Sequence, residues 1–139
     1  DYLMRPELIN AAVLAYLGDS VFEMMVRDYL VKESGLVKLN DFQKEAIKYV
    51  SASSHAKFMH VMMDEGFFSD IEIGIYKRGR NTRESKKENL DHIHSTGFEA
   101  IIGTLYLEEN YERLEMIFNR YKEYVNGPSG ILLSISSIL

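Results

Sequence analysis

The distribution of proline is the feature that most constrains how this chain can fold. Its only two prolines, Pro6 and Pro128, lie near the two ends of the sequence. Proline breaks helices because it lacks an amide hydrogen and its ring clashes with the preceding turn, so the stretch between them is free to be helical. Apolar residues recur there at helical spacing, as at Phe42, Ala46, Ile47 and Val50. We therefore expect an all-α fold of about six or seven helices.

Capping residues predict where several of these helices begin and end. The segment "SHAKFMHVMMDEG" has Ser51 or Ser53 as its candidate cap, and Gly66 as its stop. "SDIEIGIYKRG" begins at Ser69, which favours another capped helix. The polar segment "NTRESKKENLD" that follows is expected to be a loop.

Length and composition indicate one globular domain. The chain has 139 residues, of which 46% are hydrophobic and 27% are charged. It has no cysteine, which excludes disulfide scaffolds, zinc ribbons and thiol catalysis. No apolar run approaches the length of a membrane span and no signal-peptide pattern opens the chain, so we expect a cytoplasmic protein without membrane contact. We assign residues 1–126 to the domain; the apolar tail 127–139 has no assigned role and is expected to pack on the domain or a second subunit.

The basic residues are concentrated in one segment. The formal net charge is −5, which argues mildly against nucleic acid as a partner. Between Lys77 and Lys87, however, "KRGRNTRESKK" carries six basic residues against one acid, Glu84. A solvated loop and a phosphate-binding segment are both compatible with this run of charge.

Two strongly apolar segments each contain a single central acid. Asp19 is the only charged side chain between Leu8 and Phe22, and Glu99 is the only one between Ile93 and Leu107. An ionised carboxylate in apolar surroundings must be paired, neutralised or bound to a metal.

Glycines flank both acids inside the predicted helices. Gly18 precedes Asp19, while Gly97 and Gly103 lie on either side of Glu99. Because a glycine inside a helix destabilises it by about 1 kcal/mol relative to alanine, these positions indicate a close approach of another helix or a ligand. If the helices cross there, the two acids face each other and repel unless one is protonated or a cation lies between them. Oxygen ligands of this kind suit Mg²⁺ or Mn²⁺.

Structural roles for the two acids remain open at this point. Asp19 is also a candidate helix cap after a break at Gly18, although Phe22 stands where a capping box would have Glu or Gln. Glu99 is also a candidate partner for a buried Arg or Lys.

The segments around the two acids resemble the motifs of the ribonuclease III family. "YLGDSVFE" is similar to the Leu-Gly-Asp motif of that family, and "STGFEAIIGTLYLEE" is similar to its second motif. The resemblance covers roughly residues 8–125, with about 80 residues between the acids. It is strongest to the Mini-ribonuclease III subgroup, which lacks a separate double-stranded-RNA-binding domain: "YKRGRN" and the position of Glu23 match that subgroup.

The resemblance implies a metal-dependent endonuclease that cleaves double-stranded RNA and leaves 5′-phosphate and 3′-hydroxyl ends. Asp19 and Glu99 would be the catalytic residues and the ligands of Mg²⁺, or of Mn²⁺. Around them, outer-shell water would be oriented by Glu23, Ser95 and Thr96. The residues implied in RNA binding are Lys77, Arg78, Gly79, Arg80, Asn81, Lys86 and Lys87. The family further implies a homodimer that acts on ribosomal RNA precursor (23S), with a ribosomal protein as a candidate partner.

Two departures from the family motifs keep alternative functions open. Full-length family members have further acids where this chain has Ala15 and Thr96. The Mini subgroup is similarly reduced, so the loss is interpreted as subgroup membership. An RNA-binding module of the same fold with weak or no catalysis is the alternative, and a helical protein-interaction domain with structural acids is a third.

Overall fold

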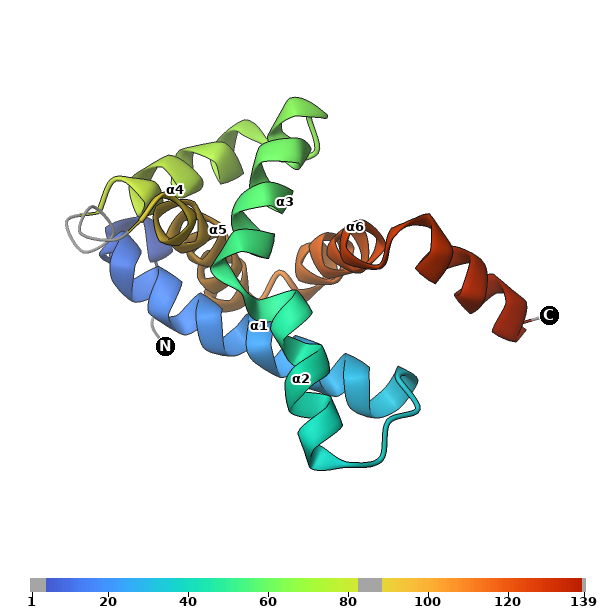
Figure 1. Cartoon of the computed structure of the whole chain (residues 1–139). Helices are drawn as coiled ribbons and strands as arrows, with labels where there is room; N and C mark the ends of the chain where they lie inside the picture. Colours follow the sequence, from blue (N-terminus) through green and yellow to red (C-terminus); the bar gives the residue numbers. More distant parts are fainter. Residues whose placement is uncertain (1–4, 83–88, 139) are drawn as a thin grey trace.

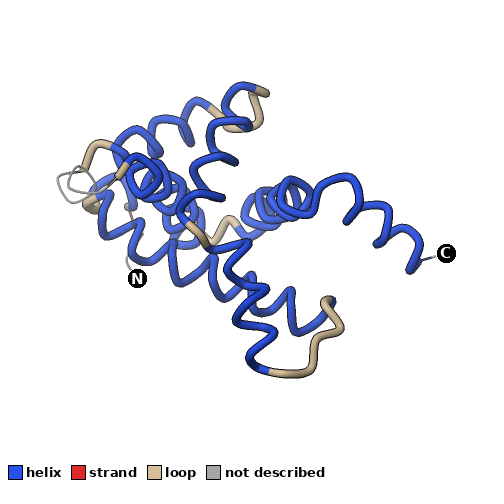
Figure 2. Tube along the Cα trace, in the orientation of Figure 1, coloured by secondary structure: helices blue, strands red, loops and turns tan. Residues whose placement is uncertain are grey.

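Six α-helices and one short 3-10 helix make up the described chain. The computed structural model describes residues 5–82 and 89–138. In chain order the elements are η1 (Pro6–Leu8), α1 (Ala11–Glu33), α2 (Leu39–Val50), α3 (Ala52–Asp64), α4 (Asp70–Arg80), α5 (Leu90–Leu107) and α6 (Tyr111–Ile138). Figure 2 shows helices and loops and no strand among these residues, which confirms the all-α prediction.

The caps expected from the sequence begin the helices. The Ser69 hydroxyl accepts a hydrogen bond from the backbone N–H of Glu72, whose carboxylate accepts one from the N–H of Ser69, so a full capping box starts α4. Ser51, rather than Ser53, caps α3. Gly66 follows α3 with φ 72°, a left-handed conformation that glycine adopts readily at helix ends.

Helix α5 occupies the centre of the domain. Figure 1 looks nearly along its axis, with α1, α3 and α4 around it, and these three helices make its most extensive contacts. Along α5 the most deeply buried side chains, each at most 1% exposed, are Phe98, Ala100, Ile101 and Ile102. A helix that is apolar all round must be enclosed in this way, which explains the composition of the segment.

Helices α1 and α5 cross in direct backbone contact at two glycines. A Cβ atom on Gly18 would lie 1.8 Å from the carbonyl oxygen of Glu99, and one on Gly103 would lie 2.0 Å from the carbonyl oxygen of Leu14. Neither position has room for any side chain. The close approach predicted from these glycines is therefore made by a neighbouring helix.

A second glycine pair joins α4 to α5. A Cβ atom on Gly79 would lie 2.9 Å from the Cα of Gly97, and one on Gly97 would lie 2.4 Å from the ring of Tyr76. Helix α5 is thus held by glycine contacts on two sides, which fixes its position relative to both α1 and α4.

Helix α6 completes the core and then changes direction. Ile117 and Tyr121 are fully buried in its first part. Gly127 interrupts the helix with φ 68° and ψ −177°, and Figure 1 shows the segment beyond it pointing away from the domain. This break lies where the sequence analysis divides the domain from the tail, whose role stays a prediction. Among the described helices, none has the length and apolar character needed to cross a bilayer.

Candidate active site

Two carboxyl groups, one from α1 and one from α5, meet beside the glycine crossing. Asp19 is exposed, whereas the side chain of Glu99 is only 16% exposed. A hydrogen bond joins the two side chains. The crossing brings them together because Gly18, the residue before Asp19, packs on the backbone carbonyl of Glu99. One member of the pair faces solvent while the other is embedded in protein.

Burial and the neighbouring acid change the ionisation of Glu99. Burial of the carboxyl group, the hydrogen bond to Asp19 and the charge of Asp19 raise the pKa of Glu99 to about 9. At neutral pH and without a cation, Glu99 therefore keeps its proton and donates it in the hydrogen bond to Asp19. The pair carries one negative charge instead of two.

We expect this raised pKa to make the metal-free protein less stable as pH rises. The pKa of Glu99 is 4.5 in the unfolded chain and about 9 in the folded protein. Its contribution to stability is therefore complete below pH 4.5 and is lost as the pH rises toward about 9. Glu99→Gln keeps a hydrogen-bond donor and cannot ionise. In EDTA near pH 8 it should therefore be more stable than wild type by at least about 1 kcal/mol, the free energy of roughly one pKa unit.

Chemical denaturation of both proteins near pH 8 and near pH 5 measures this difference. Near pH 5, close to the unfolded pKa of 4.5, little of the stabilisation has been lost, so the difference should be much smaller than near pH 8. An equal difference at both pH values would show that the substitution acts through packing and not through ionisation.

A buried histidine that the sequence analysis did not identify lies behind Glu99. His55 on α3 is 1% exposed, and burial lowers its pKa to about 4. Its Nδ1 lies 3.2 Å from the Ser95 hydroxyl and 3.9 Å from Glu99 Oε2. Because the ring is neutral at physiological pH, the longer contact is not an ion pair. The signal available in the sequence was spacing, since His55 shares the helical i, i+3, i+4, i+7 pattern of Phe58, Met59 and Met62.

The three residues expected around the acids have different surroundings. Glu23 lies one turn after Asp19 on α1 and forms an ion pair with Arg27 at 2.9 Å. The Ser95 side chain is buried and contacts His55. The Thr96 hydroxyl donates a hydrogen bond to the His92 carbonyl oxygen at 2.7 Å, so its hydrogen is engaged within α5. Ser95 and Glu99 are one helical turn apart on the same face of α5.

The pair offers a cation only two protein carboxyl groups. In the part of the chain that the structure describes, no three His, Cys, Asp or Glu side chains converge to hold a metal. Mg²⁺ commonly takes one or two carboxylates and keeps water for its other positions. The oxygen donors of Asp19 and Glu99, one of them exposed, fit an ion of this kind.

The described part of the basic segment lies mostly in the last turn of α4, the helix that was expected from Ser69 onward. Lys77 and Arg78 are exposed there, Arg80 lies over the Tyr76 ring at 5.4 Å, and Asn81 follows as the C-cap. Lys86 and Lys87 lie outside the described residues.

Gly79 has a different role from the one expected. The resemblance to the ribonuclease III family implied that Gly79 takes part in RNA binding. The structure instead buries Gly79 against Gly97 and Ala100 of α5. Its missing side chain serves helix packing, because any Cβ there would contact α5.

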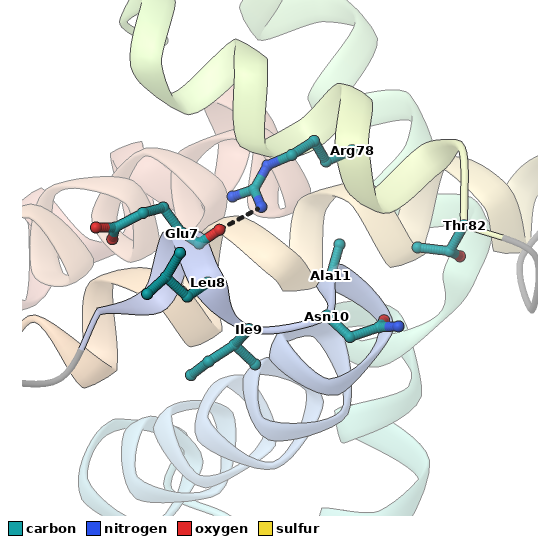
Figure 3. A pocket seen from close by; sticks show the side chains of 7 residues that line it. All are labelled: Glu7, Leu8, Ile9, Asn10, Ala11, Arg78 and Thr82. Atoms are coloured by element: carbon teal, nitrogen blue, oxygen red, sulfur yellow. Dashed lines mark hydrogen bonds between the residues drawn. The ribbon is translucent and has the colours of Figure 1, made fainter.

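Arg78 extends from α4 toward the start of α1. Figure 3 shows its guanidinium beside Glu7, whose carbonyl oxygen accepts a hydrogen bond from Nη1 at 3.5 Å. An open pocket of about 650 Å³ lies here, lined by Glu7, Leu8, Ile9, Asn10, Ala11, Arg78 and Thr82. Neither carboxyl group of the pair lines this pocket.

A comparison with known protein families identifies the family to which this chain belongs. The ribonuclease III domain family matches residues 12–110, a range that contains Asp19, Glu99 and both glycine crossings. The chain belongs to the ribonuclease III family. It is an endoribonuclease of that family.

Relatives within the ribonuclease III family confirm the resemblance to the Mini subgroup. The Mini-ribonuclease 3 of Streptococcus pneumoniae is 42% identical over 124 residues, which cover 86% of this chain and 96% of that protein. The Mini-ribonuclease 3 of Staphylococcus aureus is 40% identical over 124 residues, covering 86% and 92%. A crystal structure of a Fusobacterium nucleatum protein shares the fold with a TM-score of 0.69 and 24% identity, covering 81% of this chain and 90% of that one.

Proposed function

We propose that this ribonuclease III family member hydrolyses phosphodiester bonds of double-stranded RNA in a reaction that depends on a divalent metal ion. The observation that carries the proposal is the contact of Asp19 with Glu99 at the α1–α5 crossing. The products would have 5′-phosphate and 3′-hydroxyl ends.

Asp19 and Glu99 would hold Mg²⁺, with Mn²⁺ as the alternative ion. When the proton between the two carboxyl groups leaves, their oxygens become anionic ligands. A divalent cation favours this ionised form because it is attracted to the negative charge. When bound, such an ion lowers the pKa of a coordinated water and neutralises charge that develops on the scissile phosphate. Asp19 is exposed and would be the ligand accessible to RNA, while Glu99 is largely buried on α5.

The end of α4 is the proposed RNA-binding surface. Lys77 and Arg78 are exposed, and Arg80 and Asn81 lie beside them. A-form RNA is recognised mostly through its backbone shape, phosphates and 2′-hydroxyls, which such a basic surface can contact without reading sequence. Lys86 and Lys87 extend the same basic segment in sequence.

A homodimer is the proposed assembly, because cleavage of a duplex needs one site for each strand. A symmetric dimer presents the same surface from each copy. The exposed apolar side chains of α1 support a contact there: Val13 is 54% exposed and Tyr16 is 80% exposed. Tyr16 is one turn from Asp19, so a contact at this surface would bring two carboxyl pairs near each other.

The proposed natural substrate is ribosomal RNA precursor, in particular the 23S precursor, in the cytoplasm. A ribosomal protein is the proposed accessory partner. The similarity to Mini-ribonuclease 3 proteins over most of the chain supports these proposals.

Cleavage of duplex RNA by the purified protein tests the proposed function. We expect a labelled duplex and a 23S precursor fragment to be cut with Mg²⁺ or Mn²⁺ and to remain intact in EDTA. The new ends should accept a label only after removal of a 5′-phosphate. If the duplex is bound but never cut with either ion, the chain is an RNA-binding module, and the departures at Ala15 and Thr96 favour that alternative. If it is neither bound nor cut, the proposal is wrong.

A further inference from the structure

An apolar groove lies between α2 and the second half of α1. It encloses about 560 Å³, and its apolar lining includes Leu30, Val31, Val37, Leu39, Phe42 and Ile47. Val37 is 90% exposed and Ile47 is 62% exposed, so these two side chains meet water in a single copy of the chain. Covering them with another apolar segment would remove that surface from water, which favours association.

The groove favours a partner without charge. Among the described residues that line it, the charged ones are Glu23 and Arg27, and these form an ion pair with each other at 2.9 Å. Because the two charges compensate each other, the groove has little electrostatic attraction for a charged segment. An uncharged apolar segment can cover the groove without breaking this ion pair.

The tail of the chain is such a segment. None of the residues 124–139 is charged. Within helix α6, Ile131, Ile135 and Ile138 recur at i, i+4 and i+7, a spacing that puts them on one helix face, whereas Ser136 falls outside that face. Amphipathic helices with anchors at this spacing bind to apolar grooves.

The lengths of the groove and of the tail agree. At about 1.5 Å per residue in an α-helix, the row of three isoleucines in the tail is about 10 Å long. The groove follows α1 from Glu23 to Val31, about 12 Å, and α2 from Leu39 to Val50, about 16 Å. All three isoleucines therefore fit within the length of the groove.

The tail begins on the far side of α1 and α2 from the groove of its own chain. Asn126 accepts a hydrogen bond from the Tyr49 hydroxyl at 2.6 Å and donates one to the Tyr29 hydroxyl at 3.3 Å. Tyr29 is two residues from Val31, and Tyr49 is two residues from Ile47. Each tyrosine therefore lies about 200° around its helix from a residue that lines the groove. Figure 1 shows the tail continuing away from the domain, which leaves the groove open to another copy.

We propose that the tail of one copy binds in the α1–α2 groove of a second copy, with Ile131, Ile135 and Ile138 against the apolar lining. Two copies that exchange tails in both directions form a closed symmetric dimer. This contact differs from the one proposed around Tyr16, and it does not depend on the metal site or on cleavage.

Disulfide cross-linking between two differently substituted chains tests this contact directly. The chain has no cysteine, so Ile47→Cys in one chain and Ile135→Cys in another, made longer by a tag, provide one thiol each. Mixed in equal amounts with oxidised glutathione, they should form the mixed dimer as the main product, because a disulfide needs Cα atoms within about 7 Å. Ile71→Cys replaces Ile47→Cys in the control. Ile71 is 78% exposed on α4 and does not line the groove, so this pair should form little mixed dimer.

Charge substitutions measure what the row of isoleucines contributes. Ile135→Asp places an ionised carboxyl group in the apolar contact and should weaken self-association by at least about tenfold in sedimentation equilibrium. Ser136→Asp adds the same charge to the same tail outside the row, so its dissociation constant should stay within about twofold of wild type. Ile47→Asp should weaken association from the groove side. Because Ile47 is exposed, the circular dichroism spectrum of this variant should remain that of wild type.

Four results would overturn the exchange of tails. Two of them are a yield of mixed dimer no higher than that of the Ile71→Cys control, and an equal weakening by Ser136→Asp and Ile135→Asp. A dimer that neither Ile135→Asp nor Ile47→Asp weakens would have the α1 surface as its contact instead. A chain with both cysteines that forms its disulfide only within one copy would show that the tail fills its own groove.

Discussion

Asp19→Asn lowers the single-turnover rate of duplex cleavage by about a thousandfold, because metal-ion stabilisation of the transition state contributes several kcal/mol and each tenfold in rate corresponds to about 1.4 kcal/mol. The amide cannot supply the charge that the ion requires. The exposed position of Asp19 means that its replacement leaves the core unchanged. Duplex affinity measured in EDTA should therefore equal or slightly exceed that of wild type, since a negative charge near the phosphates is removed.

Asp28→Asn is the matched control on the same helix. Asp28 is also an exposed aspartate of α1, and its partner is Lys32 at 2.9 Å. An exposed pair of this kind contributes little to stability, so cleavage by this variant should stay within about twofold of wild type. Equal activity of Asp19→Asn and Asp28→Asn would remove Asp19 from the catalytic machinery.

Glu99→Gln should abolish cleavage as Asp19→Asn does. Unlike a mutation that damages the fold, it should make the metal-free protein more stable. The amide removes a buried carboxyl group whose ionisation disfavours the fold near neutral pH. A variant that is inactive and more stable than the metal-free wild type would separate catalysis from folding. Low activity together with low stability would instead indicate a structural role for Glu99.

Gly18→Ala is expected to destabilise the protein by about 3 kcal/mol or more, the upper part of the range for an overpacked core. The added Cβ would lie 1.8 Å from the Glu99 carbonyl oxygen and 2.8 Å from the Gly103 nitrogen, both of them backbone atoms that no side-chain rotation can move. Helices α1 and α5 must separate, and Asp19 then moves away from Glu99. Denaturant unfolding should show the loss of stability, and cleavage should fall with it.

Gly74→Ala provides the contrasting substitution. Gly74 is an exposed residue within α4, and a Cβ there meets nothing within 4 Å. Replacing an unconstrained helical glycine by alanine should stabilise the protein by about 0.5–1 kcal/mol. If Gly18→Ala and Gly74→Ala had the same effect, the crossing of α1 and α5 would not depend on glycine.

Local sequence patterns predicted the helices because the interactions that form them are local. The capping box of Ser69 and Glu72 spans three residues, and the stop at Gly66 depends on one backbone angle. The loop was expected from Asn81, and α4 indeed continues through Arg80 with its basic last turn and has Asn81 as its C-cap.

The pairing of the acids was predictable in part. In each of two apolar helices a single carboxyl group lies near an interior glycine, which predicts a close approach of another helix or a ligand. The structure shows that α1 and α5 cross in this way at Gly18 and Gly103. The buried position of Gly79 was not predictable, because a glycine in a basic segment fits a phosphate contact and a helix contact equally well.

The sequence by itself determined the all-helical fold, most helix ends and the two acids, since proline placement, capping and apolar spacing act over a few residues. Only the tertiary structure decided that His55 lies buried between the Tyr49 carbonyl and the Ser95 hydroxyl, and that Gly79 faces α5. These features depend on atoms that lie up to 40 positions apart in the chain, as His55 and Ser95 do, and meet only when three helices pack together.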